Sequence, residues 1–159
     1  MNPKTRHELW DGHAGPIEVS IDEPTAAIRG LAVIAHPHPL FGGTKDNKVV
    51  QTLARAFLQM GYTTLRFNFR GVGQSAGTHD NGQGETDDLA QLTEQARTTL
   101  LPVELQSQPV AMAGFSFGAF VTSHGAQRLR EAGINIGKLV LVGTATSRFD
   151  VAPVPDNTL

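Results

Sequence analysis

The stretch AMAGFSFGAF, residues 111–120, decides the fold. It holds Gly114, Ser116 and Gly118 in a G-x-S-x-G pattern, with an apolar run before it and a helix-like run after it. A sharp strand-to-helix turn crowds the positions two before and two after the serine, which favours glycine at both. Such a turn lifts the serine oxygen clear of the backbone and leaves the amide of Phe117 free at a helix N-terminus. The pattern therefore predicts a nucleophilic Ser116.

The alternative is that Ser116 only caps the following helix, since serine is a favoured N-cap residue. A cap by itself does not require a glycine on either side. We therefore prefer the nucleophile over the cap.

Outward from this turn, short apolar runs alternate with helical stripes. Several of the runs are apolar throughout, as in strands that are buried on both faces. The alternation predicts an α/β fold: one doubly wound, mainly parallel sheet with helices on both faces, formed by residues 1–159 as a single domain. The predicted strands are residues 16–21, 30–36, 62–69, 109–115 and 137–145. The predicted helices are a stripe from Val49 to Leu58 that ends at Gly61, then residues 85–101 and 116–133.

Composition excludes several classes of function. Apolar residues make up 40% and charged residues 18% of the chain, which is typical of a globular domain. The net charge of −2 offers no basic field for nucleic acid, and the absence of cysteine rules out disulfides and thiolate metal sites. No signal-peptide pattern and no membrane-length apolar run occur. We expect a soluble, cytoplasmic domain with no membrane partner, and a homo-oligomer stays open.

Three motifs carry a resemblance to a known superfamily: AHPHPLFGGTKDNKVV (35–50), LRFNFRGVGQSAG (65–77) and AGFSFGAF (113–120). In order and spacing they resemble the α/β hydrolases, and most of all the small bacterial dienelactone-hydrolase-like members with an H-P-H-P loop. The resemblance implies the α/β-hydrolase fold and a serine hydrolase, carboxylesterase-like, acting on a small-molecule ester or related acyl compound. It implies no cofactor and no metal.

The resemblance also implies an oxyanion hole. One donor is the amide of Phe117, directly after the nucleophile, and the second comes from the loop at residues 36–43. The two prolines of that loop have no amide hydrogen. The remaining donors in its H-P-H-P-L-F stretch are His38, Leu40 and Phe41, and the choice between His38 and Leu40 stays open.

In the superfamily the acid and the histidine of the triad follow the nucleophile along the chain. The tail SRFDVAPVPDNTL (147–159) resembles the approach to the strand that carries the acid, so we expect both triad partners beyond Leu159. The fold is accordingly expected to lack its last strands and helix. Asp150 and Asp156 lie one strand early for the usual acid position, although some hydrolases take their acid from that strand. His124 lies about 12 Å from Ser116 along the same helix.

Other polar residues have alternative interpretations. A zinc site at His36, His38 and Asp46 is disfavoured, because a loop with alternating prolines is a poor chelate. A dinucleotide loop at Gly71, Gly73 and Gly77 lacks a helix that opens directly after it.

For the remaining polar residues we expect structural roles: surface or packing positions for His79 and His124, and helix-dipole complementation for Glu85, Asp87 and Asp88. A hydrolase-fold binding module without catalysis is the second functional hypothesis.

Overall fold

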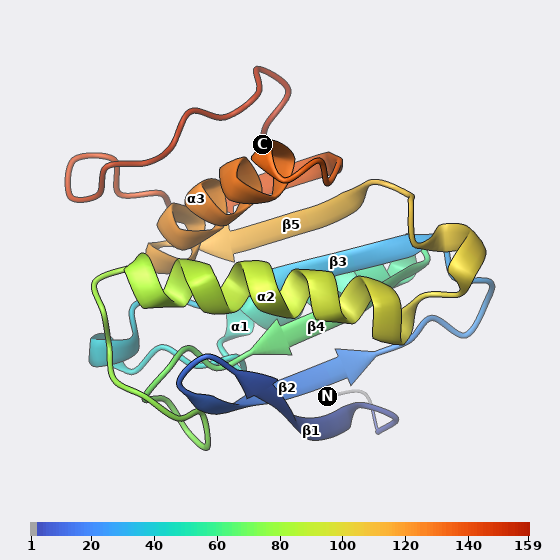
Figure 1. Cartoon of the computed structure of the whole chain (residues 1–159), viewed down its shortest axis with the longest axis horizontal. Coiled ribbons are helices and arrows are strands. Elements are labelled where there is room, and N and C mark those ends of the chain that lie inside the picture. Colours follow the sequence, from blue (N-terminus) through green and yellow to red (C-terminus); the bar gives the residue numbers. More distant parts are fainter. Residues whose placement is uncertain (1–2) are drawn as a thin grey trace.

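The computed structural model describes residues 3–159, which form a six-stranded sheet between two layers of helices (Figure 1). The strand order is β1-β2-β4-β3-β5-β6. The strands are β1 (Arg6–Gly12), β2 (Gly15–Asp22), β3 (Gly30–Ala35), β4 (Tyr62–Phe67), β5 (Val110–Phe115) and β6 (Ile136–Val142). β3 to β6 pair in parallel, whereas β1 and β2 join the sheet as antiparallel neighbours. The predicted doubly wound, mainly parallel sheet is confirmed.

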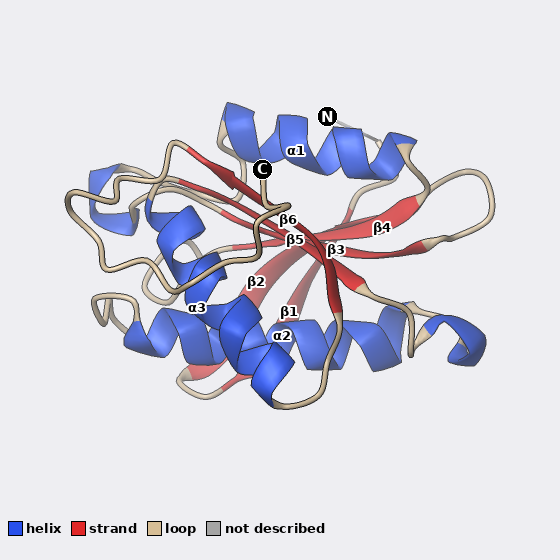
Figure 2. Cartoon of the chain, turned by 90° about the horizontal axis from the view of Figure 1, so that it is seen from above, coloured by secondary structure: helices blue, strands red, loops and turns tan. Residues whose placement is uncertain are grey.

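The helices cover opposite faces of this sheet. α1 (Lys48–Gln59) lies on one face, and α2 (Gln83–Leu100) and α3 (Phe117–Glu131) lie side by side on the other (Figure 2). Two short 3₁₀ helices, η1 (Pro39–Phe41) and η2 (Val103–Leu105), lie in the connections. No helix within residues 3–159 is long and apolar enough to cross a bilayer.

The continuous apolar run of β3 divides its side chains between two cores. Leu31 and Val33 belong to the larger core beneath α2 and α3, whereas Ala32 and Ile34 pack toward α1. Successive strand residues point to opposite faces, so a strand covered on both faces must be apolar at every position.

Local signals set the ends of α1. The side chain of Asn47 caps its N-terminus by accepting hydrogen bonds from Val49 N at 2.9 Å and Val50 N at 3.5 Å. After the helix, Gly61 takes a φ of +90°, a left-handed conformation that favours glycine. The predicted stop at Gly61 is confirmed.

Some predicted boundaries were wrong. β1 was not predicted, because six of its seven residues are exposed or half-buried and only Trp10 is buried. α2 begins at Gln83, two residues early, after Gly82 in a left-handed conformation without a side-chain cap. The strands predicted at 62–69 and 137–145 end at Phe67 and Val142, where the chain leaves the sheet for the loops.

The acidic residues of α2 face tertiary partners as well as the helix N-terminus. Asp88 forms a two-pronged ion pair with Arg70, at 2.9 Å and 3.0 Å, and Asp87 pairs with Arg128 of α3. The prediction of a helix-dipole role is therefore incomplete, because Asp87 and Asp88 also connect α2 to other parts of the chain.

Candidate active site

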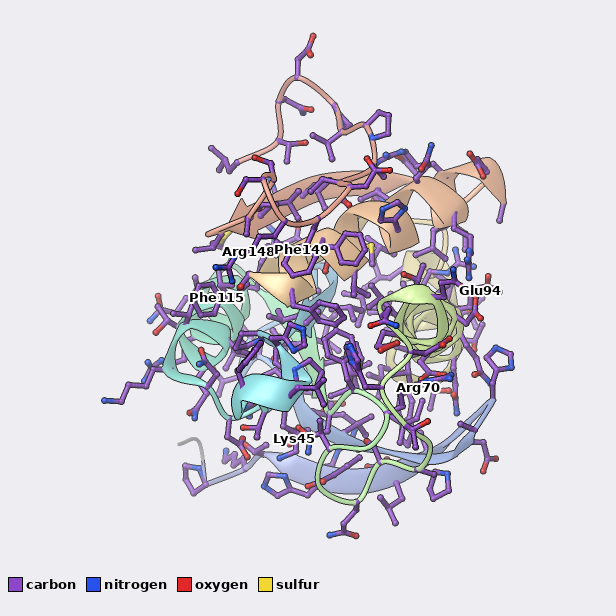
Figure 3. The ribbon with its side chains drawn as sticks, turned by 90° about the vertical axis from the view of Figure 1, so that its left-hand side faces the viewer. Lys45, Arg70, Glu94, Phe115, Arg148 and Phe149 are labelled. Atoms are coloured by element: carbon purple, nitrogen blue, oxygen red, sulfur yellow. The ribbon has the colours of Figure 1, made fainter. Side chains whose placement is uncertain are left out.

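The loops that follow the parallel strands meet at one edge of the sheet, which Figure 3 faces. Arg70 belongs to the loop after β4, and Arg148 and Phe149 belong to the loop after β6. The turn from β5 into α3 and the loop after β3 complete this edge. In an open parallel sheet, ligands bind at this carboxyl edge.

Ser116 lies at the turn between β5 and α3 with φ 56° and ψ −116°. A positive φ is strained for a residue with a Cβ and costs on the order of 1–3 kcal/mol. The turn is held by hydrogen bonds from Ser116 N to Val142 O and from Ala119 N to Ser116 O, both 2.9 Å. The Ser116 side chain makes no hydrogen bond to the backbone N–H groups of α3, so the structure does not support a role for Ser116 as an N-cap.

The two flanking glycines are required by close backbone approaches. A Cβ on Gly114 would collide with the carbonyl of Gly118. A Cβ on Gly118 would collide with the carbonyl oxygens of Ala35 and His36 at the end of β3. Gly114 therefore allows the tight turn itself, and Gly118 allows the turn to pack closely against the end of β3.

His36 ties the loop after β3 to the loop after β4. Its ring is fully buried, with Nδ1 2.6 Å from Pro37 O, and its Nε2 accepts a hydrogen bond from Phe69 N at 3.0 Å. These partners fix a neutral tautomer with the hydrogen on Nδ1. Burial lowers the pKa of His36 from 6.5 to about 4. Both ring nitrogens are engaged, which leaves neither for a metal.

The amides of the same loop differ in their partners. Leu40 N donates to His38 Nδ1 at 3.2 Å. Phe41 N and Gly43 N both donate to His38 O, at 3.1 Å and 3.0 Å. Within residues 3–159, the amide of His38 and the amide of Phe117 have no hydrogen-bond acceptor.

Phe117 is the centre of an aromatic cluster under the serine. Its buried ring lies 4.8 Å from the His38 ring and 5.7 Å from the Phe149 ring, measured between centroids. Phe120, one turn along α3, stacks on Phe149 at 5.0 Å. These contacts connect three loops of the site through the residue that follows Ser116.

The glycine-rich loop after β4 has a structural explanation. Ser75 Oγ donates to Asn68 O at 2.7 Å and accepts from Glu18 N at 3.0 Å, and Arg70 holds Asp88 of α2. Gly73 lies where a Cβ would collide with the side chains of Glu18 and Asn68. Close packing on β2 therefore accounts for this glycine without a phosphate ligand.

No described imidazole or carboxylate forms a hydrogen bond with the Ser116 hydroxyl. His124 Nε2 contacts Asp150 O at 2.7 Å, away from the serine. Among residues 3–159, no group of three His, Asp or Glu side chains is arranged to hold a metal ion.

Sequence reasoning missed one pair near the site, His79 and Glu85. Glu85 is fully buried, and the His79 ring lies between it and the site, 5.4 Å from Phe117 and 5.1 Å from His38. The stretch HDNGQGE (79–85) offered a weak signal, since a polar loop that leads into a helix rarely buries a carboxylate without a partner.

An open hollow of about 440 Å³ adjoins the aromatic cluster at Phe120. It lies between the start of α2, the outer side of α3 and the loop after β6. Its lining residues are Asn81, Gly82, Gln83, Thr86, Asp87, Phe120, His124, Arg128 and Asp150.

We expect Gly118→Ala to lower the free energy of unfolding by about 1–3 kcal/mol, because its Cβ must push against backbone carbonyls. Backbone NMR signals of Ala35 and His36 should move. Gly133→Ala is the control: its φ is +86° and its Cβ would meet no atom within 4 Å, so it introduces backbone strain without the clash. Unmoved signals at Ala35 and His36 in Gly118→Ala would contradict the contact.

His36 should make stability depend on pH. Because its folded pKa of about 4 lies below 6.5, the unfolded chain binds the extra proton first. The free energy of unfolding should therefore be highest above pH 6.5. It should fall by about 3 kcal/mol in total as the pH is lowered toward 4. Urea unfolding across this range should show a flatter profile for His36→Gln. His13→Gln, at an exposed position, should keep the original profile.

Comparison with known proteins places this chain in a family. A family model described as serine aminopeptidase, S33, matches residues 28–155. Protein RP471 of Rickettsia prowazekii, described as uncharacterized, is 39% identical over 112 residues. That match covers 70% of this chain and 45% of the Rickettsia protein, so the chain spans less than half the length of this relative.

Solved structures agree with the family match. XC6422 of Xanthomonas campestris, described as an α/β serine hydrolase without lid, aligns with a TM-score of 0.82 at 34% identity, over 98% of this chain and 68% of that one. An α/β serine hydrolase homologue of Coxiella burnetii aligns with a TM-score of 0.75 at 38% identity, over 87% and 62%. The chain therefore belongs to the serine aminopeptidase S33 family of α/β hydrolases.

Proposed function

We propose that this protein is a serine hydrolase that acts on small esters or related acyl compounds, with Ser116 as the nucleophile. The observation that carries the proposal is the strained conformation of Ser116, at φ 56°, followed directly by the Phe117 amide without an acceptor. A second amide without an acceptor, that of His38, lies in the loop after the neighbouring strand β3. A cap or a spacer would not require that strain, and strain of this kind recurs where a serine oxygen must be presented to a substrate.

In this proposal the amides of Phe117 and His38 bind the oxyanion. Leu40 is disfavoured as the second donor because its N–H is already directed at His38 Nδ1. Donors that are held in place before the reaction stabilise developing charge without reorganisation. Pro37 and Pro39 on either side of His38 restrict the loop, and His36 anchors it to Phe69.

The histidine and the acid of the triad are assigned to residues outside 1–159. Two observations support this assignment: no described imidazole contacts the Ser116 hydroxyl, and the Xanthomonas and Rickettsia relatives are longer than this chain. The base would accept the Ser116 proton as the oxygen attacks the acyl carbon, and the acid would orient the base.

The surroundings of Ser116 favour a substrate of modest size. Leu40 and Phe41 are 68% and 83% exposed at the edge of the site, and Phe120 leads into the open hollow. Exposed apolar side chains next to a polar reaction centre suit an ester with an apolar acyl or alcohol group.

Reaction with a fluorophosphonate, followed by intact-mass measurement, tests the nucleophile. The 159-residue chain should take up one adduct slowly, because an oxyanion hole without its base still retains about 10³–10⁴-fold over water. Ser116→Ala should take up none. Ser147→Ala, which removes an exposed serine of the neighbouring loop, should react like the unaltered chain.

Two results would count against the proposal. An adduct that persists in Ser116→Ala would place the reactive group elsewhere. No adduct at all would favour the second hypothesis, a hydrolase-fold module that binds its ligand without cleaving it.

A further inference from the structure

Glu85 is an unusual residue for the first turn of a helix, since its side chain has no exposure to solvent. Its Oε1 accepts a hydrogen bond from Asp80 N at 2.8 Å. Its Oε2 is buried and has no hydrogen-bond partner within residues 3–159. A buried carboxylate is costly unless other groups compensate its charge, so its neighbours indicate what it does.

The nearest side-chain partner of Glu85 is His79. Nδ1 of His79 lies 3.2 Å from Glu85 Oε1, a close contact that is not aligned as a hydrogen bond. A carboxylate on this side favours the tautomer with hydrogen on Nδ1. Nε2 is then the free nitrogen, and it has no hydrogen-bond partner among the described residues. The side chain of His79 is 13% exposed, so a ligand can reach it.

The His79 ring lies against the two residues whose amides are proposed to bind the oxyanion. Its centroid is 5.1 Å from that of His38 and 5.4 Å from that of Phe117. His79 therefore packs on the side chains of the two residues that carry those amides, which makes it a neighbour of the loops that hold the proposed carbonyl position.

The charged groups around His79 give its free nitrogen a preference for hydrogen-bond donors. Glu85 faces it from α2 and His38 faces it from the loop after β3. Burial and the neighbouring His79 lower the pKa of His38, whereas Glu85 raises it. Arg70 lies near Glu85, but its guanidinium is paired with Asp88. Glu85 is thus left facing His79 and not Arg70.

We propose that His79, oriented by Glu85, determines substrate specificity: its Nε2 accepts a hydrogen bond from a hydroxyl or ammonium group on the carbon next to the acyl carbon. This inference rests on the proposed function, because it uses the same carbonyl position. His79 contacts the substrate, and Glu85 acts through His79 as a positioning residue.

Binding of three amides of nearly equal size tests the proposal without requiring hydrolysis. Propanamide has no donor at the relevant carbon, lactamide has a hydroxyl and alaninamide has an ammonium. Dissociation constants would be measured by NMR on the ¹⁵N-histidine-labelled chain. One additional hydrogen bond should make lactamide and alaninamide bind about three- to tenfold more tightly than propanamide and should shift the His79 Nε2 resonance.

Matched variants separate the two residues. His79→Phe keeps an aromatic ring against His38 and Phe117 but removes the acceptor, so all three amides should bind equally. Glu85→Gln keeps an acceptor for Asp80 N but removes an acidic group, so alaninamide should lose the part of its advantage that depends on charge and bind no more tightly than lactamide. His13→Phe, at an exposed position, should leave all three constants unchanged.

Equal affinities in the unaltered chain, binding of none of the amides, or a donor preference that survives His79→Phe would each overturn the proposal. Its failure is distinct from failure of the proposed function. The fluorophosphonate reaction reports on Ser116 whether or not His79 selects the substrate, and amide binding does not depend on a reactive serine.

Discussion

The backbone contact between Gly118 and the carbonyl oxygens of Ala35 and His36 is the constraint on which the site depends. It brings the first turn of α3 directly against the end of β3. Because β3 and β5 are adjacent parallel strands, this contact fixes the distance between the loops that follow them. Ser116, the proposed nucleophile, and the loop with the free His38 amide are thereby held together by main-chain atoms, which vary little with side-chain motion.

Buried polar side chains then make the walls of the site rigid. His36 bridges from the loop after β3 to Phe69, Ser75 pins the loop after β4 to Asn68, and Arg70 fastens that loop to α2. Each is a hydrogen bond or ion pair in a place with little or no water, where a lost partner is expensive. An oxyanion hole benefits from such order, since its donors must be in position before charge develops.

The aromatic cluster around Phe117 connects this rigid frame to the proposed substrate-binding region. Phe117 touches the rings of His38, His79 and Phe149. The His79 and Glu85 pair adds polar side chains to an otherwise aromatic cluster. In a site of this kind, apolar contacts supply affinity and a few placed polar groups determine orientation.

The sequence by itself determined the alternation of strands and helices, the turn at Ser116 and the stop at Gly61, because these follow from local sterics and from apolar periodicity. Only the tertiary structure decided which loop amides are free, since Leu40 N finds its acceptor two residues away in a folded loop. The partnership of His79 with Glu85 was equally beyond local pattern. The pair lies near the site because His79 contacts Phe117, and that contact forms only when α3 is packed against the sheet.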